Sequence, residues 1–328
     1  MKKDNNFKTT IGGQALIEGI MMRGPEKDAV VLRGKDGLKL EVNERKTRSS
    51  KSPLAWPFVR GMINMANSLS AGVKATMRSA DFAIEEEEAK ENEGKEPVKE
   101  KTQEKEKKGQ GALMGITLTI SVLLSVGLFF VLPEFIMSFF TAYIPSVLVR
   151  NLLSGVIRIG ILLGYMYLAS LLKDMRRVFA YHGAEHKTIA CYEAGLELTV
   201  ENVRKQRRFH PRCGTSFLFV VMFLSILVFS LGEHLLLQIA PGLPLLGGFL
   251  YNLIRIVFKL LLLPILISVT YEINRWVGRH DNWFTAVLAA PGLWLQRIST
   301  KEPDDSMIEV GIAAVEAVLP EQKGADQW

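Results

Sequence analysis

The sequence predicts an α-helical membrane protein with about four transmembrane helices, a small N-terminal β-unit and a cytoplasmic helical loop. Of the 328 residues, 48% are hydrophobic and 23% are charged, yet the two kinds lie in separate blocks along the chain. The segment 111–132 contains no charged residue. It is long enough to cross a hydrocarbon core of about 30 Å, which requires about 20 helical residues. Lysine and arginine cluster in the loops beside such segments, as is typical of multi-pass membrane proteins.

The first part of the chain, residues 11–45, has the alternation and the turn residues of a small β-unit. Glycines flank the first predicted strand, and a glycine-containing hairpin-type turn joins the other two. The predicted strands are 14–22, 29–32 and 38–42, and the turn is 34–37.

Residues 53–77 are predicted to form an amphipathic helix, because apolar side chains recur there at helical spacing. This helix would either pack on the β-unit or lie in the membrane interface. We assign residues 1–84 to one cytoplasmic region. The segment 85–110 that follows is rich in Glu and Lys, which predicts a solvated helix extension or a disordered linker without chemistry of its own.

Apolar segments in two pairs, within 111–172 and 215–274, are the predicted transmembrane helices. Arg158 interrupts the second segment, and Arg255 and Lys259 lie in the fourth. Charged side chains are costly within hydrocarbon, so we expect these three to face partners or water. The predicted spans are 111–132, 152–172, 216–237 and 249–273, the last with a kink at Pro264.

The basic residues also predict the orientation. The loop 173–214 contains nine lysines and arginines, whereas the loops on the opposite side contain almost none. By the positive-inside rule, this loop and both termini are cytoplasmic, and the protein resides in the cell membrane. In the cytoplasmic region 275–328, the segment 283–295 predicts an interfacial or re-entrant helix that residues 280–282 cap. Residues 304–319 predict a final amphipathic helix.

The composition and the position of the basic residues limit the classes of binding partner that we expect. The formal net charge is +6, but topology and anionic lipids account for basic residues that lie beside apolar segments. We therefore expect the lipid bilayer and an unidentified substrate or membrane partner, and no nucleic acid. Two cysteines, Cys191 and Cys213, do not suggest a disulfide-rich secreted domain. The N-terminus lacks the apolar core of a cleavable signal peptide, so insertion should rely on the internal spans.

The most informative motif is HGAEH at residues 182–186, in the cytoplasmic loop. On a helix, positions i, i+3 and i+4 share a face, so both imidazoles and the carboxylate would point the same way. Such a set can hold a divalent metal ion, with Glu185 as a ligand or a general base. The H-x-x-E-H order is known from inverted zinc peptidases. The alternative is a polar surface turn in which Glu185 pairs with Lys187 or Arg177. Gly183 favours this alternative slightly, because glycine destabilises a helix by about 1 kcal/mol relative to alanine.

A second motif, RFHPRCGTS at residues 208–216, lies in the same loop. His210 or Cys213 could complete a metal shell begun by the two histidines, since both residue types bind zinc. Another interpretation is a nucleophilic Cys213 assisted by His210, because Arg208 and Arg212 would favour the thiolate. The third is a basic cap that anchors the next span at the lipid headgroups, with an inert cysteine.

Longer distinctive segments occur along the chain: IGGQALIEGIMMRGP (11–25), YHGAEHK (181–187), HPRCGTS (210–216), PGLWLQ (291–296) and EPDDSMIEV (302–310). Together they resemble the bacterial YqhQ-like family of membrane proteins. The likeness covers nearly the whole chain except the segment rich in Glu and Lys. The resemblance implies a membrane protein of a family labelled as predicted metal-dependent enzymes, and it implies no particular substrate.

The resemblance adds three residues of the N-terminal motif, Gln14, Glu18 and Arg23. On one extended strand Gln14 and Glu18 would share a face. Glu18 could then reach a metal ion held by the two histidines. The alternative is a tight structural strand, rich in glycine and methionine.

The resulting prediction is a metal-dependent membrane hydrolase that acts at the cytoplasmic face on a peptide or lipid-linked substrate. Zinc is the expected ion, because the candidate ligands offer nitrogen and sulfur. An arginine would hold an anionic or carbonyl group of the substrate. The alternative is a non-enzymatic membrane scaffold or a transport-related subunit. The candidate metal ligands are His182, His186, His210 and Cys213, and the candidate catalytic residues are Glu185, Glu18, Arg212 and Arg23.

A geometric criterion separates the two hypotheses. Ring nitrogens of His182 and His186 must be able to meet at a common point about 2.0–2.1 Å from each, with a third ligand within reach. Diverging imidazoles would leave only the scaffold hypothesis.

Overall fold

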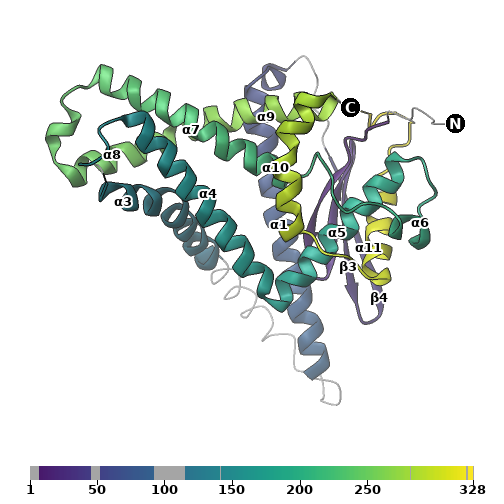
Figure 1. Cartoon of the computed structure of the whole chain (residues 1–328). Helices are drawn as coiled ribbons and strands as arrows, with labels where there is room; N and C mark the ends of the chain where they lie inside the picture. Colours follow the sequence, from purple (N-terminus) through teal and green to yellow (C-terminus); the bar gives the residue numbers. More distant parts are fainter. Residues whose placement is uncertain are drawn as a thin grey trace. The chain divides into compact units, whose positions relative to one another are not determined.

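The computed structural model describes residues 7–45, 52–91, 115–140, 142–280, 282–322 and 324–327 (Figure 1). The chain divides into two compact units, each assembled from segments that are distant in sequence. The sheet unit comprises Met1–Glu88, Met166–Val221 and Ile267–Trp328, and the helical unit comprises Ala89–Tyr165 and Met222–Leu266.

An antiparallel sheet of four strands, in the order β1-β2-β3-β4, forms the centre of the sheet unit. The predicted hairpin turn is confirmed, because Gly34 pairs with Gly37. Gly37 has a φ of 120°, which glycine adopts readily because it has no Cβ. The strands are β1 (Gly12–Leu16), β2 (Gly19–Arg23), β3 (Lys27–Gly34) and β4 (Gly37–Glu44).

The prediction of a single strand over residues 14–22 is wrong, because the chain reverses between β1 and β2. Glu18 lies in this turn with a φ of 51°, an uncommon conformation for a residue with a side chain. The turn contains no glycine or asparagine, the usual signal of a two-residue hairpin loop. Instead, the Glu18 carbonyl accepts a hydrogen bond from the Arg33 N–H (2.8 Å), and the Glu18 carboxylate binds Arg177. Gln14 and Glu18 therefore do not share the face of one strand.

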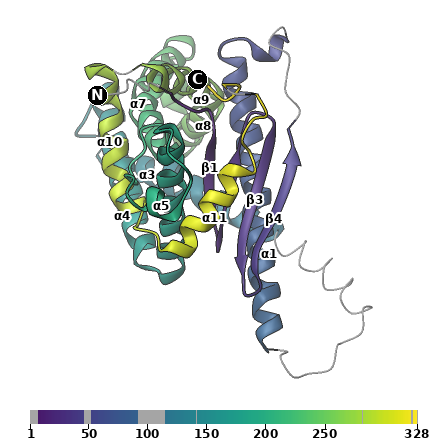
Figure 2. The same ribbon diagram turned by 90° about the vertical axis from the view of Figure 1, so that its right-hand side faces the viewer.

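Helices pack on both faces of the sheet (Figure 2). One face, with Ile20 and Val31, packs on α5 (Lys173–Glu193) and α11 (Asp305–Glu316). The other face packs on α1 (Val59–Glu91), so this helix covers the β-unit, one of the two predicted arrangements. The contacts on that second face join Leu16, Met21, Val30 and Leu32 to Ala75 and Phe82.

Helix α1 is longer than the predicted helix 53–77. A short 3-10 helix, η1 (Pro53–Ala55), precedes it, and α1 itself continues to Glu91. The beginning of the predicted linker 85–110 is therefore helical. The rest of that linker, from residue 92, lies outside the described residues.

Within the described ranges, four helical segments are long and apolar enough to cross a membrane: Gly115–Ser138, Leu148–Leu171, Leu218–Ile239 and Gly248–Arg279. The prediction of an α-helical membrane protein with about four spans and a small β-unit is thereby confirmed. The elements that form or join these segments are η2 (Gly127–Val131), α3 (Leu132–Ser138), α4 (Val147–Leu171), α7 (Gly214–Ile239), η3 (Leu243–Leu246), α8 (Gly248–Leu261) and α9 (Leu263–Arg279).

Two prolines affect the spans differently. The first span continues past the predicted end at residue 132, because Pro133 lies in the first turn of α3, where a helix tolerates a missing N–H. The fourth span is interrupted between Leu261 and Leu263, next to Pro264, where a kink was predicted.

Charged side chains of the helical unit pair with one another inside these helical segments. Lys259 Nζ donates to Glu134 Oε1 (2.5 Å). Arg255 Nη2 donates to Glu233 Oε2 (3.0 Å) and lies 3.3 Å from the second oxygen of Glu134. Arg158 donates to a backbone carbonyl (2.9 Å) and to a serine hydroxyl (3.2 Å). These residues face partners, as expected, because an isolated charge would be costly in the low-dielectric interior.

The remaining helices belong to the sheet unit. The helix predicted to be interfacial or re-entrant is α10 (Trp283–Ser299), which continues beyond its expected end at residue 295. Asn282 caps it as predicted, and its side chain accepts a hydrogen bond from the Thr285 N–H (2.9 Å). The predicted final helix is α11, and a short helix, α6 (Val200–Arg204), follows α5.

Candidate metal centre

Helix α5 carries the H-x-x-E-H motif, so the predicted helical placement of residues 182–186 is confirmed. Gly183 has a role in packing that could not be predicted from its low helix propensity. A Cβ on this residue would lie 2.0 Å from the backbone oxygen of Lys301. The Lys301 N–H in turn donates to the Phe179 carbonyl (2.8 Å). Glycine therefore allows the chain after α10 to approach the backbone of α5 closely.

The two imidazoles are oriented by backbone carbonyls. His182 Nδ1 lies 2.9 Å from the Ser299 oxygen, and His186 Nδ1 lies 2.6 Å from the Arg208 oxygen. A carbonyl can only accept, so each Nδ1 donates, and each Nε2 is the ring nitrogen left for a metal ion. In metal-binding histidines the ring nitrogen away from the metal typically donates to a carbonyl or carboxylate in this way.

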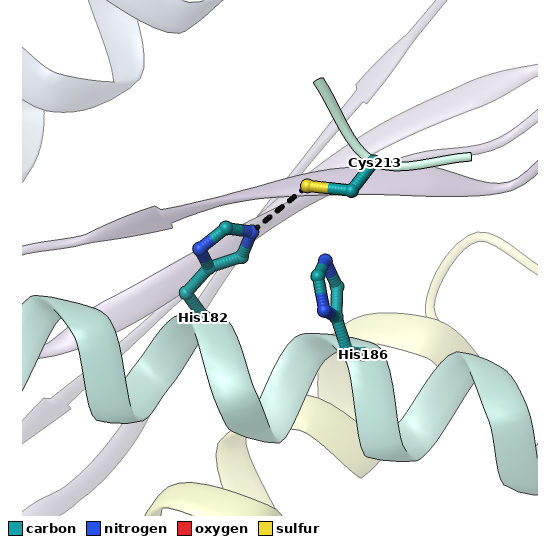
Figure 3. Close-up of side chains that lie close together, drawn as sticks. All are labelled: His182, His186 and Cys213. Atoms are coloured by element: carbon teal, nitrogen blue, oxygen red, sulfur yellow. Dashed lines mark hydrogen bonds between the residues drawn. The ribbon is translucent and has the colours of Figure 1, made fainter. Parts of the chain in front are cut away.

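Cys213 completes the group (Figure 3). The ligand atoms of His182, His186 and Cys213 all lie within 4.8 Å of one another. His182 Nε2 is 3.2 Å from the sulfur. In the view of Figure 3, one ring nitrogen of each histidine points toward the sulfur. His186 Nε2 is buried and has no hydrogen-bond partner among the described residues. These three residues could therefore hold a metal ion, with the Cys213 sulfur within reach of both imidazoles.

The charges of this group favour a thiolate. Burial by itself raises the pKa of Cys213, but the hydrogen bond with His182 and the positive charge of the two neighbouring histidines bring it well below its usual range. Burial by itself lowers the pKa of His182, whereas the interaction with the Cys213 sulfur raises it to about 9. The thiolate is the form of cysteine that binds metal ions, and a metal ion would displace the proton from His182.

Glu185 lies beside this group, and only one of its two carboxylate oxygens has a hydrogen-bond partner among the described residues. Its Oε1 accepts a hydrogen bond from the Gly13 N–H on β1 (3.1 Å). Its Oε2 is buried without a partner among the described residues. Burial raises the pKa of Glu185, against the opposing effects of His182 and His186. A buried carboxyl with a raised pKa next to metal-ligand side chains is well suited to accept and release a proton.

His210 is not part of the ligand group. Its Nε2 lies 3.4 Å from Glu193 Oε2, and Arg212 also binds Glu193. Burial lowers the pKa of His210, while the Glu193 interaction opposes the shift. The backbone of His210 is fixed by Gln296, whose side-chain amide accepts from its N–H and donates to its carbonyl (2.8 Å each). Of the two predicted third ligands, the structure brings Cys213 and not His210 to the pair.

Glu18 and Arg23 lie apart from the ligand group. Glu18 is bound by Arg177 (2.5 Å) and by the Tyr181 hydroxyl (3.2 Å), which corrects the expectation that its strand presents it to the histidines. Arg23 donates to Asp28 (3.2 Å) and to a serine hydroxyl (2.8 Å) and lines a cavity next to the centre.

Sequence reasoning missed Gly13 and Glu193. A Cβ on Gly13 would lie 2.7 Å from the Met21 oxygen and 3.0 Å from the Glu185 carboxyl carbon. The paired glycines at 12–13 were the available signal, because a close approach to backbone often requires glycine. Glu193 had no local signal, since its partners Arg212 and His210 are on a different segment.

The donor set fits zinc. Two imidazole nitrogens and one thiolate are typical of a three-ligand site that leaves a position for water or substrate, and here each imidazole is also held by a backbone carbonyl. The buried, unpartnered atoms His186 Nε2 and Glu185 Oε2 are the structural observations that support this fit.

The fold and this site define the class as a multi-span membrane protein with a His–His–Cys group on its sheet unit. The chain belongs to the family described as "Protein of unknown function (DUF1385)", whose profile matches residues 56–321. It is 30% identical over 318 residues to "Uncharacterized protein YqhQ" of Bacillus subtilis (strain 168), covering 94% of this chain and 92% of that protein. The resemblance to a YqhQ-like family is thereby confirmed. No solved structure matches the chain.

Proposed function

We propose that the protein is a metal-dependent membrane hydrolase whose site faces the cytoplasm. The observation that carries the proposal is the convergence of His182, His186 and Cys213, with ligand atoms within 4.8 Å of one another. In this proposal these three residues hold a zinc ion or another divalent metal. The ion would supply Lewis-acid activation of water and of a substrate oxygen.

The residues around this group have separate roles. Glu185 Oε2 takes the proton of the attacking water, and the Gly13 N–H keeps the carboxylate in position through Oε1. Arg23 lines the adjoining cavity and is placed to hold an anionic or carbonyl group of the substrate. Arg212 also lines the cavity, with its guanidinium held by Glu193. The substrate is a peptide or a lipid-linked molecule near the bilayer.

Replacing Glu185 with glutamine tests the hydrolase proposal. The amide cannot accept the proton, so activity should fall by about 10²–10⁴-fold in complementation of a deletion strain. The metal content, measured by mass spectrometry of the purified protein, should stay at the wild-type level because Glu185 is not a ligand in this proposal. The matched control is Glu197→Gln, an exposed carboxylate of the same loop, which should complement fully. Full complementation by Glu185→Gln would contradict the proposal, and loss of metal would make Glu185 a ligand.

A cysteine nucleophile is the second candidate, because His182 lies 3.2 Å from the Cys213 sulfur. A metal site explains more of the observed contacts than a cysteine nucleophile does. A single base suffices for a cysteine nucleophile, whereas here two histidines approach the same sulfur and both have oriented Nδ1 atoms. A chain that purifies without metal but reacts rapidly with iodoacetamide at Cys213 would favour the nucleophile.

The topology is part of the proposal. The positive-inside rule places both termini and the loop 173–214 in the cytoplasm. Reporter fusions after Gly111, within 142–150, at Val200 and within 240–247 should report inside, outside, inside and outside. A cytoplasmic signal from the 142–150 fusion would contradict the four-span arrangement.

A further inference from the structure

A cavity of about 670 Å³ adjoins the metal centre within the sheet unit. Glu185, His186 and Cys213 all lie in its wall. Two of these residues, Glu185 and His186, are at most 5% exposed and have a buried polar atom without a partner among the described residues. A molecule in the cavity would therefore reach the centre.

Arginines dominate the charge of this cavity. Among the described residues that line it, Glu185 is the only carboxylate. The guanidinium groups come from the sheet, from the loop before α7 and from the end of α9, so no single element accounts for them. The arginines that line the cavity are Arg23, Arg45, Arg212, Arg275 and Arg279.

Two of these arginines share one counter-ion. Arg23 Nε and Arg45 Nε lie 3.2 Å and 3.6 Å from the same oxygen of Asp28. Burial lowers the pKa of Arg45, and the positive charge of Arg23 lowers it further, against the attraction of Asp28. One carboxylate thus compensates two cations, which leaves positive potential at this wall.

Two others form no ion pair within the described part of the chain. The side chains of Arg275 and Arg279 make no hydrogen bond or ion pair with any residue that the structure describes. The nearby carboxylate of Glu272 is already held by Arg60, through contacts of 2.7 Å and 2.5 Å. Unpaired guanidinium groups on the wall of a cavity attract anions, and the planar fork of arginine matches the oxygens of a phosphate.

The same wall lies at the end of a membrane span. Tyr271, Arg275 and Arg279 line the cavity and belong to the last turns of Gly248–Arg279, one of the four segments that can cross a membrane. Exposed tryptophans stand close by in sequence, with Trp276 41% and Trp283 77% exposed. Exposed tryptophan at the end of a span is typical of the membrane–water interface. The cavity is therefore accessible to a molecule whose polar group lies at the headgroup level.

We propose that this cavity binds the phosphate group of an amphiphilic substrate and so places the rest of its headgroup at the metal centre. The inference rests on the proposed function, because it names the substrate class of the same site. A volume of about 670 Å³ exceeds what a single phosphate needs, which leaves room for a headgroup.

Binding of defined probes tests this inference on the full-length protein in detergent, before and after treatment with a chelator. The probes are dioctanoyl phosphatidic acid, dioctanoyl phosphatidylcholine and inorganic pyrophosphate, each titrated by calorimetry. Wild-type protein should prefer phosphatidic acid to phosphatidylcholine. Arg275→Gln and Arg279→Gln should each weaken phosphatidic acid binding about tenfold, since a hydrogen bond to a charged group contributes about that much. The matched control is Arg297→Gln, an exposed arginine of α10 that does not line the cavity.

Both sources of phosphate have a defined outcome. Arginine-dependent binding of pyrophosphate as well as phosphatidic acid supports a site for the phosphate itself, and binding of phosphatidic acid alone supports a lipid phosphate. Equal affinity of Arg275→Gln and Arg297→Gln for phosphatidic acid, or no binding of either phosphate probe, would overturn the inference. Metal content is measured on the same samples, so the two proposals fail separately. Phosphate binding without metal would contradict the hydrolase alone, and metal without phosphate binding would contradict the inference alone.

Discussion

Replacing His186 with alanine is expected to abolish the stoichiometric metal content of the purified protein. Its side chain is 1% exposed and supplies Nε2, one of three atoms that lie within 4.8 Å of one another. Two remaining ligands would not hold zinc, because such sites generally need three or four protein ligands. His182→Ala and Cys213→Ala should give the same result. Mass spectrometry of protein extracted from membranes provides the measurement.

His210→Ala is the matched control for this experiment. His210 is also buried and lies in the same loop, and its ring packs near that of His186, but its Nε2 contacts Glu193 and is not among the grouped ligand atoms. The variant should keep the metal content of the wild type. Metal retained by His186→Ala, or lost equally from His210→Ala, would contradict the assignment of ligands.

Thiol reactivity provides a second readout of the same site. A bound metal ion should protect Cys213 from iodoacetamide, and chelation should expose its low-pKa thiolate to rapid alkylation. Cys191 is 0% exposed and burial raises its pKa, so it should remain unreactive in both states. Equal alkylation of Cys213 before and after chelation would show that no metal covers the sulfur.

Replacing Lys259 with methionine is expected to destabilise the helical unit by about 3–5 kcal/mol, the usual cost of breaking a buried ion pair. The ammonium group of Lys259 is 2.5 Å from Glu134, and both side chains are at most 5% exposed. Without Lys259, Arg255 is the cation that remains in an ion pair with Glu134 among the described residues. The yield of monodisperse protein in detergent and its thermal unfolding temperature should both fall.

Two further variants separate charge pairing from packing. Lys173→Met removes the same side chain from an exposed position and should leave stability unchanged. Glu134→Gln combined with Lys259→Met removes both charges of the pair and should recover part of the loss, because no unpaired carboxylate remains. If Lys259→Met unfolds at the wild-type temperature, the charges within the spans contribute little to the fold.

Much of the architecture could be predicted because its signals are local. Long uncharged segments can satisfy their backbone in hydrocarbon only as helices, so the spans follow from hydropathy alone. The face shared by His182, Glu185 and His186 follows from the helical repeat of 3.6 residues. Asn282 could be predicted as a helix cap because it immediately precedes an apolar helical segment. Each of these depends on residues within a few positions of one another.

The turn at Glu18 shows where local signals end. Its left-handed conformation is stabilised by Arg33 and Arg177, which lie on other elements, so alternation in residues 14–22 pointed to one strand. Gly183 is a similar case. Glycine lowers the stability of the helix, which can be predicted from the residue alone. Its role in packing depends on the close approach of Lys301, more than a hundred residues away.

Local patterns along the chain were sufficient to predict the class of protein, the spans and the pair of histidines on one face of a helix. The approach of Cys213 to that pair, the contact of His210 with Glu193 and the position of the α9 arginines beside the adjoining cavity became evident only from the packing of distant segments. Helices and spans depend on periodicity and transfer free energy along the chain. A metal shell or an anion-binding cavity depends on distances of a few ångströms between segments that packing alone brings together.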